Sequence, residues 1–443
     1  MSDNHYPLTD QSATPKFTKL KKTSKVVLQF LKQKKQQKRL ELILLSVILA
    51  LFLFRSSNGF LSQFQPRELM EEYSNNLAGK PLSLERMFSD DKLYSALGWL
   101  YIHGAVPEMS AHPPLAMYMI GLSEILFTNP VVLGTIFSIL TLVLVFLTSK
   151  KVVDTFPFAL LPVLILSLDK LYIQFSSFAF LDVYAAFFAV LAVFLLLSEK
   201  RWAAPALYVT IGLALACKWT VVFLLFLPPI YYAAKKEWNH LKLYPIYILI
   251  VILAYTATFS FYFLSNKTMM DFGYLHFTMF GIFQVQRTQM GSPPPLWILL
   301  NFLLGIEGPT YIQVLRAYTQ NMTIISEPVE RGISLIGAYN PLTWPISFSA
   351  SILTLIYSIK ENRKILPVPL AFLVLIGLFS RGKPFIWYLI PGMPFAFISL
   401  AYMIDRIFLR CENKTVAKGV LALYIVSIFV WSLFINVPSY IKF

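Results

Sequence analysis

Long apolar runs alternate with short polar segments from residue 40 to the end of the chain. Most runs have about 15 to 22 residues, and an α-helix needs roughly 20 to cross the apolar core of a membrane. We predict membrane-spanning helices at these positions: 40–60, 131–148, 156–172, 182–198, 203–217, 220–234, 243–264, 341–359, 365–380, 384–404 and 420–435. The pattern therefore predicts an all-α polytopic membrane protein with about eleven transmembrane helices.

Two longer segments, residues 61–130 and 265–340, interrupt this series. The short loops on one side of the predicted membrane carry clusters of Lys and Arg, whereas the first long segment has few for its length. Because basic loops stay on the cytoplasmic side, both long segments are predicted to be outer loops. An apolar stretch at 115–127 is short for a span and predicts a helix along the membrane surface.

The predicted membrane domain covers residues 40–437. Before it, residues 1–39 become increasingly basic and predict a cytoplasmic tail that is attracted to anionic lipid headgroups. After it, residues 438–443 form a short tail that is predicted to lie outside.

Composition supports this organisation. The chain has 443 residues, of which 57% are hydrophobic and 14% are charged, whereas a soluble domain is about one quarter charged. The net charge of +15 does not indicate a nucleic-acid partner, because the basic residues form short clusters between apolar runs. Cys217 and Cys411 are isolated, so neither a disulfide framework nor a cysteine metal site is indicated.

Polar residues that could carry chemistry collect on the predicted outer side. They lie in the outer loops and turns or within one helical turn of them: Asp90, Asp91, His112, Asp182, Lys218, Arg381 and Lys383. Charges inside a membrane are costly and usually face a polar interior. A purely structural membrane protein gives no reason for these groups to meet on one side, so the pattern favours a site at the outer face.

Several of these residues also have a structural interpretation. Asp182 could cap a helix N-terminus, where the helix dipole stabilises an anion, and Lys218 could extend its ammonium group to the membrane interface. The functional alternatives are a buried anion at Asp182 and a lysine at 218 that binds a lipid-linked phosphate. Asp90 could be a solvated loop charge or a general base, and Arg381 could hold the interface or bind a phosphate.

Several short motifs, in order along residues 88–395, resemble those of one enzyme superfamily. Asp90-Asp91-Lys92-Leu93-Tyr94 resembles the Asp-Glu-x-x-aromatic motif in the first outer loop of the GT-C glycosyltransferases. The other motifs resemble those of the dolichyl-phosphate-mannose protein O-mannosyltransferases: His112-Pro113-Pro114-Leu115, Leu181-Asp182, Gly212-Leu213-Ala214, Cys217-Lys218-Trp219-Thr220, Tyr339-Asn340-Pro341 with Trp344, and FIWYLIPGMPF at 385–395.

The sequence departs from the family pattern in four ways, one of which is that Met290-Gly291-Ser292 replaces the family's His-Pro-Tyr-Ser-Ser stretch. The second acid is Asp91 where the family has Glu, and Ser177 stands where the family has an arginine, five residues before Asp182. The large outer carbohydrate-binding-like domain of eukaryotic members is missing. This difference predicts a prokaryotic-type relative in the plasma membrane, with its active site on the outer face.

The resemblance implies transfer of mannose, with inversion, from dolichyl or another polyprenyl phosphate to a Ser or Thr hydroxyl of an exported protein. Asp90 would be the general base, and Asp91 would bind or orient the acceptor. Lys218, Arg381 and Lys383 would bind the donor phosphate.

The supporting residues implied by the resemblance are His112, Asp182, Asn340 and Tyr388. No cofactor is required, although a divalent metal ion at Asp90, Asp91 and His112 stays an open alternative. The predicted partners are the lipid-linked sugar, an acceptor protein or lipid, and membrane lipids, and the oligomeric state is left open.

Two other functions remain open at this point. A GT-C transferase could act on a lipid or glycan acceptor, as the similar aminoarabinose transferases do. A transporter of a lipid-linked sugar would also use outer charges, but it needs access from the inner face, where the predicted loops are short and basic.

Overall fold

The computed structural model describes residues 15–61, 90–104, 112–285, 300, 302–304, 311–320, 323–332, 340–379 and 386–434. By its internal contacts the chain divides into two units, Met1–Val47 and Ile48–Phe443. Among the described residues, the first unit contains only the beginning of helix α1 (Pro15–Leu61). The second unit contains the rest of α1 and all later elements.

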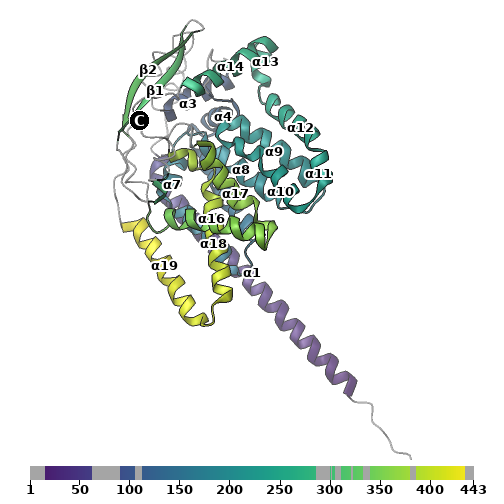
Figure 1. Ribbon diagram of the computed structural model, residues 1–443. Helices are drawn as coiled ribbons and strands as arrows, with labels where there is room; N and C mark the ends of the chain where they lie inside the picture. The colour runs from purple at the N-terminus through teal and green to yellow at the C-terminus, as the bar shows by residue number, and fades with distance from the viewer. Residues whose placement is uncertain are drawn as a thin grey trace, which may run out of the picture. The chain divides into compact units, whose positions relative to one another are not determined.

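Helices dominate the second unit (Figure 1). The main helices after α1 are α3 (Asp90–Ile102), α4 (Leu115–Phe127), α5 (Val132–Ser149), α6 (Phe156–Leu168), α7 (Lys170–Ser176), α8 (Asp182–Leu196), α9 (Ala203–Cys217), α10 (Leu227–Lys235), α12 (Tyr244–Ala257), α14 (Met269–Val285), α16 (Trp344–Lys360), α17 (Pro367–Phe379), α18 (Met393–Arg410) and α19 (Lys414–Phe434). Short helices connect several of them: η2 (Trp219–Leu225), α11 (Trp238–Lys242), α13 (Ser260–Leu264), η3 (Arg363–Ile365) and η4 (Ile386–Leu389). The predicted helical fold class is confirmed.

The helices are apolar enough for a membrane. Three described segments are long enough to cross one by themselves: Lys35–Ser57, Val132–Ser149 and Lys414–Leu433. Helices α6 and α7 are together long and apolar enough to cross, with a bend of 65° between them, which fits either a broken span or a re-entrant loop. The other apolar helices, among them α8, α9 and α12, are shorter. The chain is an integral membrane protein, and the number of about eleven spans stays a prediction.

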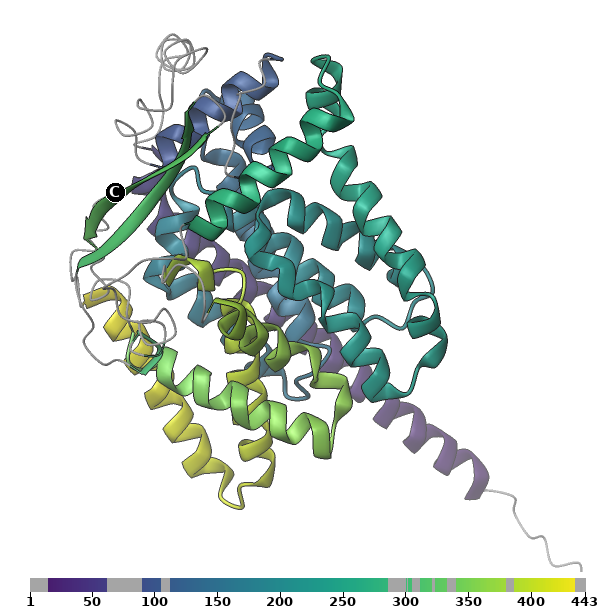
Figure 2. The ribbon, with the colours of Figure 1, turned by 45° about the horizontal axis from the view of Figure 1, so that its top comes forward.

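The predicted second outer loop contains an element that is not helical. Strands β1 (Tyr311–Gln320) and β2 (Thr323–Gly332) form an antiparallel hairpin in which Tyr311 pairs with Gly332. The hairpin lies beside α14 (Figures 1 and 2). No strands are predicted from the sequence, so this hairpin is an addition to the helical fold.

The predicted span 156–172 is broken, because a polar residue interrupts it. The side chain of Asp169 accepts hydrogen bonds from the backbone N–H groups of Leu171 and Tyr172, at 2.9 and 3.2 Å. This cap ends α6 and starts α7 in a new direction. The predicted helix 384–404 also differs, since it begins as η4 and its main part, α18, continues to Arg410.

Helices α8, α9 and α12 pack side by side, with α9 against both of the others (Figure 1). Gly212 allows α9 and α12 to approach closely. A Cβ atom at Gly212 would lie 2.7 Å from the Val251 carbonyl oxygen and 2.7 Å from the Ala254 Cβ atom. This approach brings Tyr255, the residue after Ala254, close to the end of α9.

A second close approach holds α3 against α4. A Cβ atom at Gly98 would lie 2.7 Å from the Met117 carbonyl oxygen and 2.8 Å from the backbone nitrogen of Gly121. A Cβ atom at Gly121 would in turn overlap the Gly98 carbonyl oxygen. The two helices therefore touch through their backbones, and α3, which carries Asp90 and Asp91, is fixed relative to α4.

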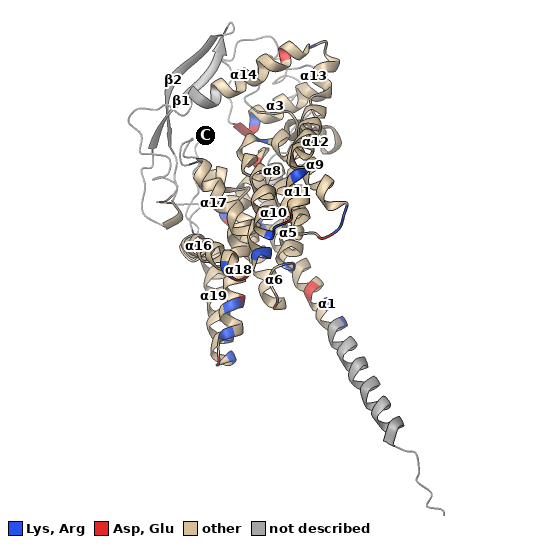
Figure 3. Cartoon of the chain, turned by 45° about the vertical axis from the view of Figure 1, so that its right-hand side comes forward, with Lys and Arg blue, Asp and Glu red and all other residues tan. Residues whose placement is uncertain are grey.

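Basic residues gather near the junction of α18 and α19, whereas the opposite end carries a few charges of both signs (Figure 3). The acidic residues of α3 and α14 lie toward the end that carries the hairpin. The basic residues near the junction of α18 and α19 lie toward the opposite end.

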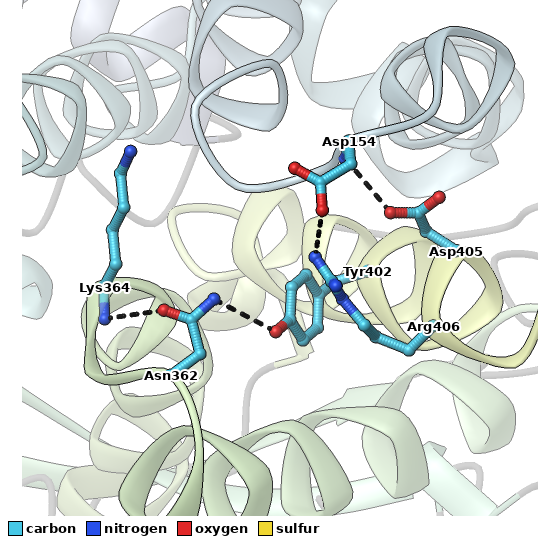
Figure 4. Close-up of polar contacts among 6 residues, drawn as sticks. All are labelled: Asp154, Asn362, Lys364, Tyr402, Asp405 and Arg406. Carbon is cyan, nitrogen blue, oxygen red and sulfur yellow. Dashed lines mark hydrogen bonds and ion pairs between the residues drawn. The ribbon is translucent and has the colours of Figure 1, made fainter. Parts of the chain in front are cut away.

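A polar cluster joins the loop after α5 to α18 (Figure 4). Asp405 is fully buried, and its carboxylate accepts a hydrogen bond from the backbone N–H of Asp154 at 3.0 Å. Arg406 pairs with the Asp154 carboxylate at 2.5 Å. Asn362, which follows α16, donates a hydrogen bond to the Tyr402 hydroxyl at 3.3 Å. These contacts tie three segments together at this end.

We predict that Gly121→Ala destabilises the protein, because the new methyl group must push α3 away from α4. Overpacking of this kind lowers the free energy of unfolding by about 1–3 kcal/mol. The matched control is Gly419→Ala in α19, where a Cβ atom has no atom within 4 Å. Unfolding in detergent should show a loss only at Gly121, and equal stability of both variants would contradict the close contact.

Candidate active site

Lys218 and Asp182 form a buried ion pair. The Lys218 Nζ atom donates to both carboxylate oxygens of Asp182, at 2.9 Å to Oδ1 and 2.8 Å to Oδ2. Their side chains are 4% and 1% exposed. A buried charge without a partner is very costly, so each residue stabilises the other in this position. Both residues are predicted site residues, but the sequence analysis does not predict that they pair.

The ends of two helices bring this pair together. Asp182 is the first residue of α8, where the helix dipole favours a negative charge. Lys218 follows the last residue of α9 and has an extended backbone, with φ −163° and ψ 134°. Since α8 and α9 are consecutive helices that pack side by side, the start of α8 meets the end of α9. The Asp182 carboxylate is therefore both a buried anion and a helix-start residue.

Tyr388 completes the surroundings of the ammonium group. The Lys218 Nζ atom lies 5.1 Å from the centroid of the Tyr388 ring, within range of a cation–π interaction. Tyr388 belongs to η4, so the C-terminal part of the chain contributes to the same site. A lysine ammonium has three N–H donors, and the two contacts to Asp182 leave one for a ligand.

The acidic motif lies in the same region. Asp90 is close enough to Asp182 for the two carboxylates to interact electrostatically. Asp90 and Asp91 form the first turn of α3, with Asp91 buried and Asp90 partly exposed. His112 packs edge-to-face against Tyr94, one helical turn after Asp90, with 5.9 Å between ring centroids. The acidic motif, the His-Pro-Pro motif and the buried ion pair are thus neighbours.

One predicted residue, Asn340, makes its contacts in a separate turn. Asn340 is buried, and its Oδ1 atom accepts a hydrogen bond from the backbone N–H of Leu342 at 3.0 Å. It shapes the turn before α16, which is a structural role. Arg381 and Lys383 lie outside the described residues, so their predicted contact with a phosphate stays a prediction.

The residues that could bind a metal ion are not arranged as ligands. Within the described part of the chain, no three His, Cys, Asp or Glu side chains are grouped closely enough to hold a metal ion. Asp90, Asp91 and His112 are all described, and they do not form such a group.

Ser177, at the position of the family arginine, lies beside the end of α1. Its hydroxyl donates to the Ser56 carbonyl oxygen at 3.3 Å. Arg55, the residue before Ser56, donates to the carbonyl oxygens of Leu168 at 3.1 Å and Ser432 at 2.9 Å. Arg55 was not predicted from the sequence as a site residue, although an arginine inside an apolar run is a signal of a buried polar contact. Both hydrogen bonds go to the backbone, so this cation holds the fold together.

No protein-family model matches this sequence, and no curated protein matches it. The structure is similar to that of ArnT from Cupriavidus metallidurans. In the apo state the TM-score is 0.51 at 12% identity, over 77% of this chain and 58% of the ArnT chain. For ArnT bound to undecaprenyl phosphate the TM-score is 0.53 at 14% identity, over 86% of this chain and 63% of that chain.

The oligosaccharyltransferase of Archaeoglobus fulgidus, in its apo form, has a TM-score of 0.48 at 13% identity, over 88% of this chain and 55% of that chain. ArnT is a GT-C glycosyltransferase, so the comparison confirms the GT-C fold that the sequence motifs predict. This chain spans 58% to 63% of the length of the two ArnT chains.

We predict that Asp182→Asn destabilises the protein, because it leaves the buried Lys218 ammonium without its counter-charge. Removing one partner of a buried pair lowers the free energy of unfolding by about 3–5 kcal/mol. The double variant Asp182→Leu with Lys218→Met should recover most of this loss, since no unpaired charge remains. Unfolding experiments in detergent measure the free energy of unfolding of the single and the double variant.

The control is an exposed ion pair, Arg410 with Glu361 at 3.4 Å. Glu361→Gln should lower the free energy of unfolding by no more than about 1 kcal/mol, because water screens this pair. A double variant at 182 and 218 that is as unstable as Asp182→Asn alone would contradict the role of the buried pair.

Proposed function

Starting from the GT-C fold of this chain, we propose that it is a membrane glycosyltransferase. It moves a sugar, predicted to be mannose, from dolichyl or another polyprenyl phosphate to a Ser or Thr hydroxyl of an exported protein. One observation carries the proposal: the Asp90–Asp91 turn, the Lys218–Asp182 pair and Tyr388 lie in one region. A carboxylate for the acceptor and a cation for the leaving phosphate are what this transfer needs.

Asp90 is proposed as the general base. An alcohol hydroxyl is a weak nucleophile, so a carboxylate must take its proton as the new C–O bond forms. Asp90 is partly exposed, whereas its neighbour Asp91 is buried. We therefore assign proton transfer to Asp90 and orientation of the acceptor to Asp91. A single displacement of this kind inverts the anomeric centre of the sugar.

Lys218 is proposed to bind the leaving phosphate. Charge develops on the phosphate as its bond to the sugar breaks, and donors that are already in place stabilise that charge best. Asp182 neutralises much of the Lys218 charge, so this lysine acts mainly as a fixed N–H donor. The net positive charge must come from additional cations, and Arg381 and Lys383 are our candidates. The site is proposed to face the outside of a prokaryotic plasma membrane.

A second candidate function keeps the donor and changes the acceptor. The similarity to ArnT bound to undecaprenyl phosphate favours a polyprenyl donor and is compatible with a lipid or glycan acceptor. Asp90 and Lys218 would have the same roles, because the acceptor is again a hydroxyl group.

The test is transfer of radiolabelled mannose from dolichyl phosphate mannose by purified protein, with a Ser/Thr-rich peptide and a lipid extract as separate acceptors. We predict that Asp90→Asn lowers the turnover number by about 10²–10⁴-fold, the usual contribution of a general base. Binding of the donor should be unchanged. The matched control, Glu361→Gln, removes an exposed carboxylate that pairs with Arg410, and it should transfer sugar like the wild type.

The possible outcomes test the acceptor, the metal ion and the enzyme assignment separately. Transfer to the lipid extract alone replaces the protein acceptor with a lipid one. Loss of activity with a chelator, and recovery with a divalent ion, adds a metal ion to the reaction. A wild-type protein that neither transfers sugar nor binds the donor would overturn the enzyme assignment and leave transport as the better account.

A further inference from the structure

A hydrogen-bonded chain connects the residue after Lys218 to helix α14. The indole Nε1–H of Trp219 donates to the Tyr255 hydroxyl oxygen at 3.2 Å. The Tyr255 hydroxyl lies 2.8 Å from His276 Nε2, and His276 Nδ1 lies 2.8 Å from the Phe272 carbonyl oxygen. Trp219 belongs to η2, Tyr255 to α12 and His276 to α14, so three separate elements meet here.

The direction of each hydrogen bond follows from chemistry. A carbonyl oxygen only accepts, so His276 Nδ1 carries a proton and donates it to Phe272. In a neutral imidazole the other nitrogen, Nε2, then accepts, and the Tyr255 hydroxyl donates to it. Tyr255 is left to accept from Trp219. Every donor in this chain has an acceptor only when His276 is neutral.

The chain is held in a tight aromatic cluster. Phe259, Tyr262, Leu275 and Met279 form its buried core, and Trp219, Tyr255 and Phe272 pack against them. The His276 ring lies 4.1 Å from the Phe272 ring and 6.1 Å from the Trp219 ring, centre to centre. The close approach of α9 and α12 at Gly212 sets the position of Tyr255. The three hydrogen-bonding side chains therefore have little freedom to move.

The backbone at Lys218 links the Trp219–Tyr255 hydrogen bond to the Lys218–Asp182 ion pair. Lys218 is extended, and its side chain reaches Asp182 of α8 while the next residue, Trp219, reaches Tyr255 of α12. The backbone between α9 and η2 is therefore fixed by two contacts, one from Lys218 to α8 and one from Trp219 to α12.

We propose that Trp219, Tyr255 and His276 are positioning residues for the donor phosphate: they fix the Lys218 ammonium and make its placement depend on α14 of the predicted second outer loop. The inference rests on the proposed function for the identity of the phosphate. Substitution of Tyr255 or His276 should weaken phosphate binding although neither residue touches Lys218. Loss of one hydrogen bond of this kind corresponds to about three- to tenfold in affinity.

The proposal also implies a dependence on pH. Burial lowers the pKa of His276 below its usual value, because the charged imidazolium is poorly solvated there. Among the described side chains packed against it, Trp219, Tyr255, Phe259 and Phe272, only Tyr255 can titrate, and no carboxylate compensates an imidazolium. The chain of hydrogen bonds is complete at pH values above the usual histidine pKa and is lost as the pH falls through the lowered value.

The experiment measures the affinity of purified full-length protein for undecaprenyl phosphate between pH 5 and 8. Tyr255→Phe and His276→Phe keep the rings and remove the hydrogen bonds, so each should weaken binding about three- to tenfold at pH 8. His276→Gln retains an acceptor near the Nε2 position and cannot titrate. It should bind like the wild type at pH 8 and lose less affinity than the wild type as the pH falls, whereas a loss common to both proteins reflects protonation of the phosphate itself, whose second pKa is about 6.

The matched control is Tyr262→Phe, which removes a hydroxyl from the same aromatic cluster but not from the hydrogen-bonded chain. Hydrogen exchange of the peptides covering 269–285 supplies a readout that needs no ligand. It should rise in Tyr255→Phe and His276→Phe and stay unchanged in Tyr262→Phe.

Wild-type affinity in Tyr255→Phe and His276→Phe would overturn the positioning role. So would an equal loss in Tyr262→Phe, since the effect would then come from packing alone. If the affinities change as expected but no sugar is transferred, the positioning role stands and the proposed transfer reaction fails.

Discussion

The burial of one positive and one negative charge is the constraint on which the rest of this structure depends. Neither Lys218 nor Asp182 can be buried alone, because the loss of hydration costs several kcal/mol per ion (about 3–5 when one partner is removed). The pair therefore fixes the end of α9 relative to the start of α8. Tyr388 is held over the same ammonium group, so the early and late parts of the chain converge there.

Much of the fold could be predicted from the sequence, because apolar runs of the right length have few structural alternatives in a membrane protein. The positions of α5, α8, α9 and α19 follow from those runs. Local polarity also pointed to Asp182 and Lys218 individually. Their pairing could not be predicted, because the two residues are 36 positions apart and their contact depends on how two helices are rotated about their axes.

Other features have weaker signals in the sequence. The hairpin 311–332 pairs two strands that are neighbours in the sequence, within a segment whose mixed polar and apolar residues predict an outer loop. The bend at Asp169 needs a single carboxylate that caps a new helix within an apolar run, and such a cap is visible only once the backbone turns. Trp219, Tyr255 and His276 each look like an ordinary aromatic position, and only the meeting of three elements gives them a common role.

The contacts around Asp405 determine which parts of the molecule can move. Its buried carboxylate and the Arg406–Asp154 pair fasten the loop after α5 to α18 (Figure 4). A carrier that alternates between two openings must separate its helices first at one end and then at the other. At the end near Asp405, separation would break the Asp405 hydrogen bond and the Arg406–Asp154 ion pair. These contacts oppose opening at that end, which favours entry of the proposed lipid substrate from the side or from the end that carries the acidic motif.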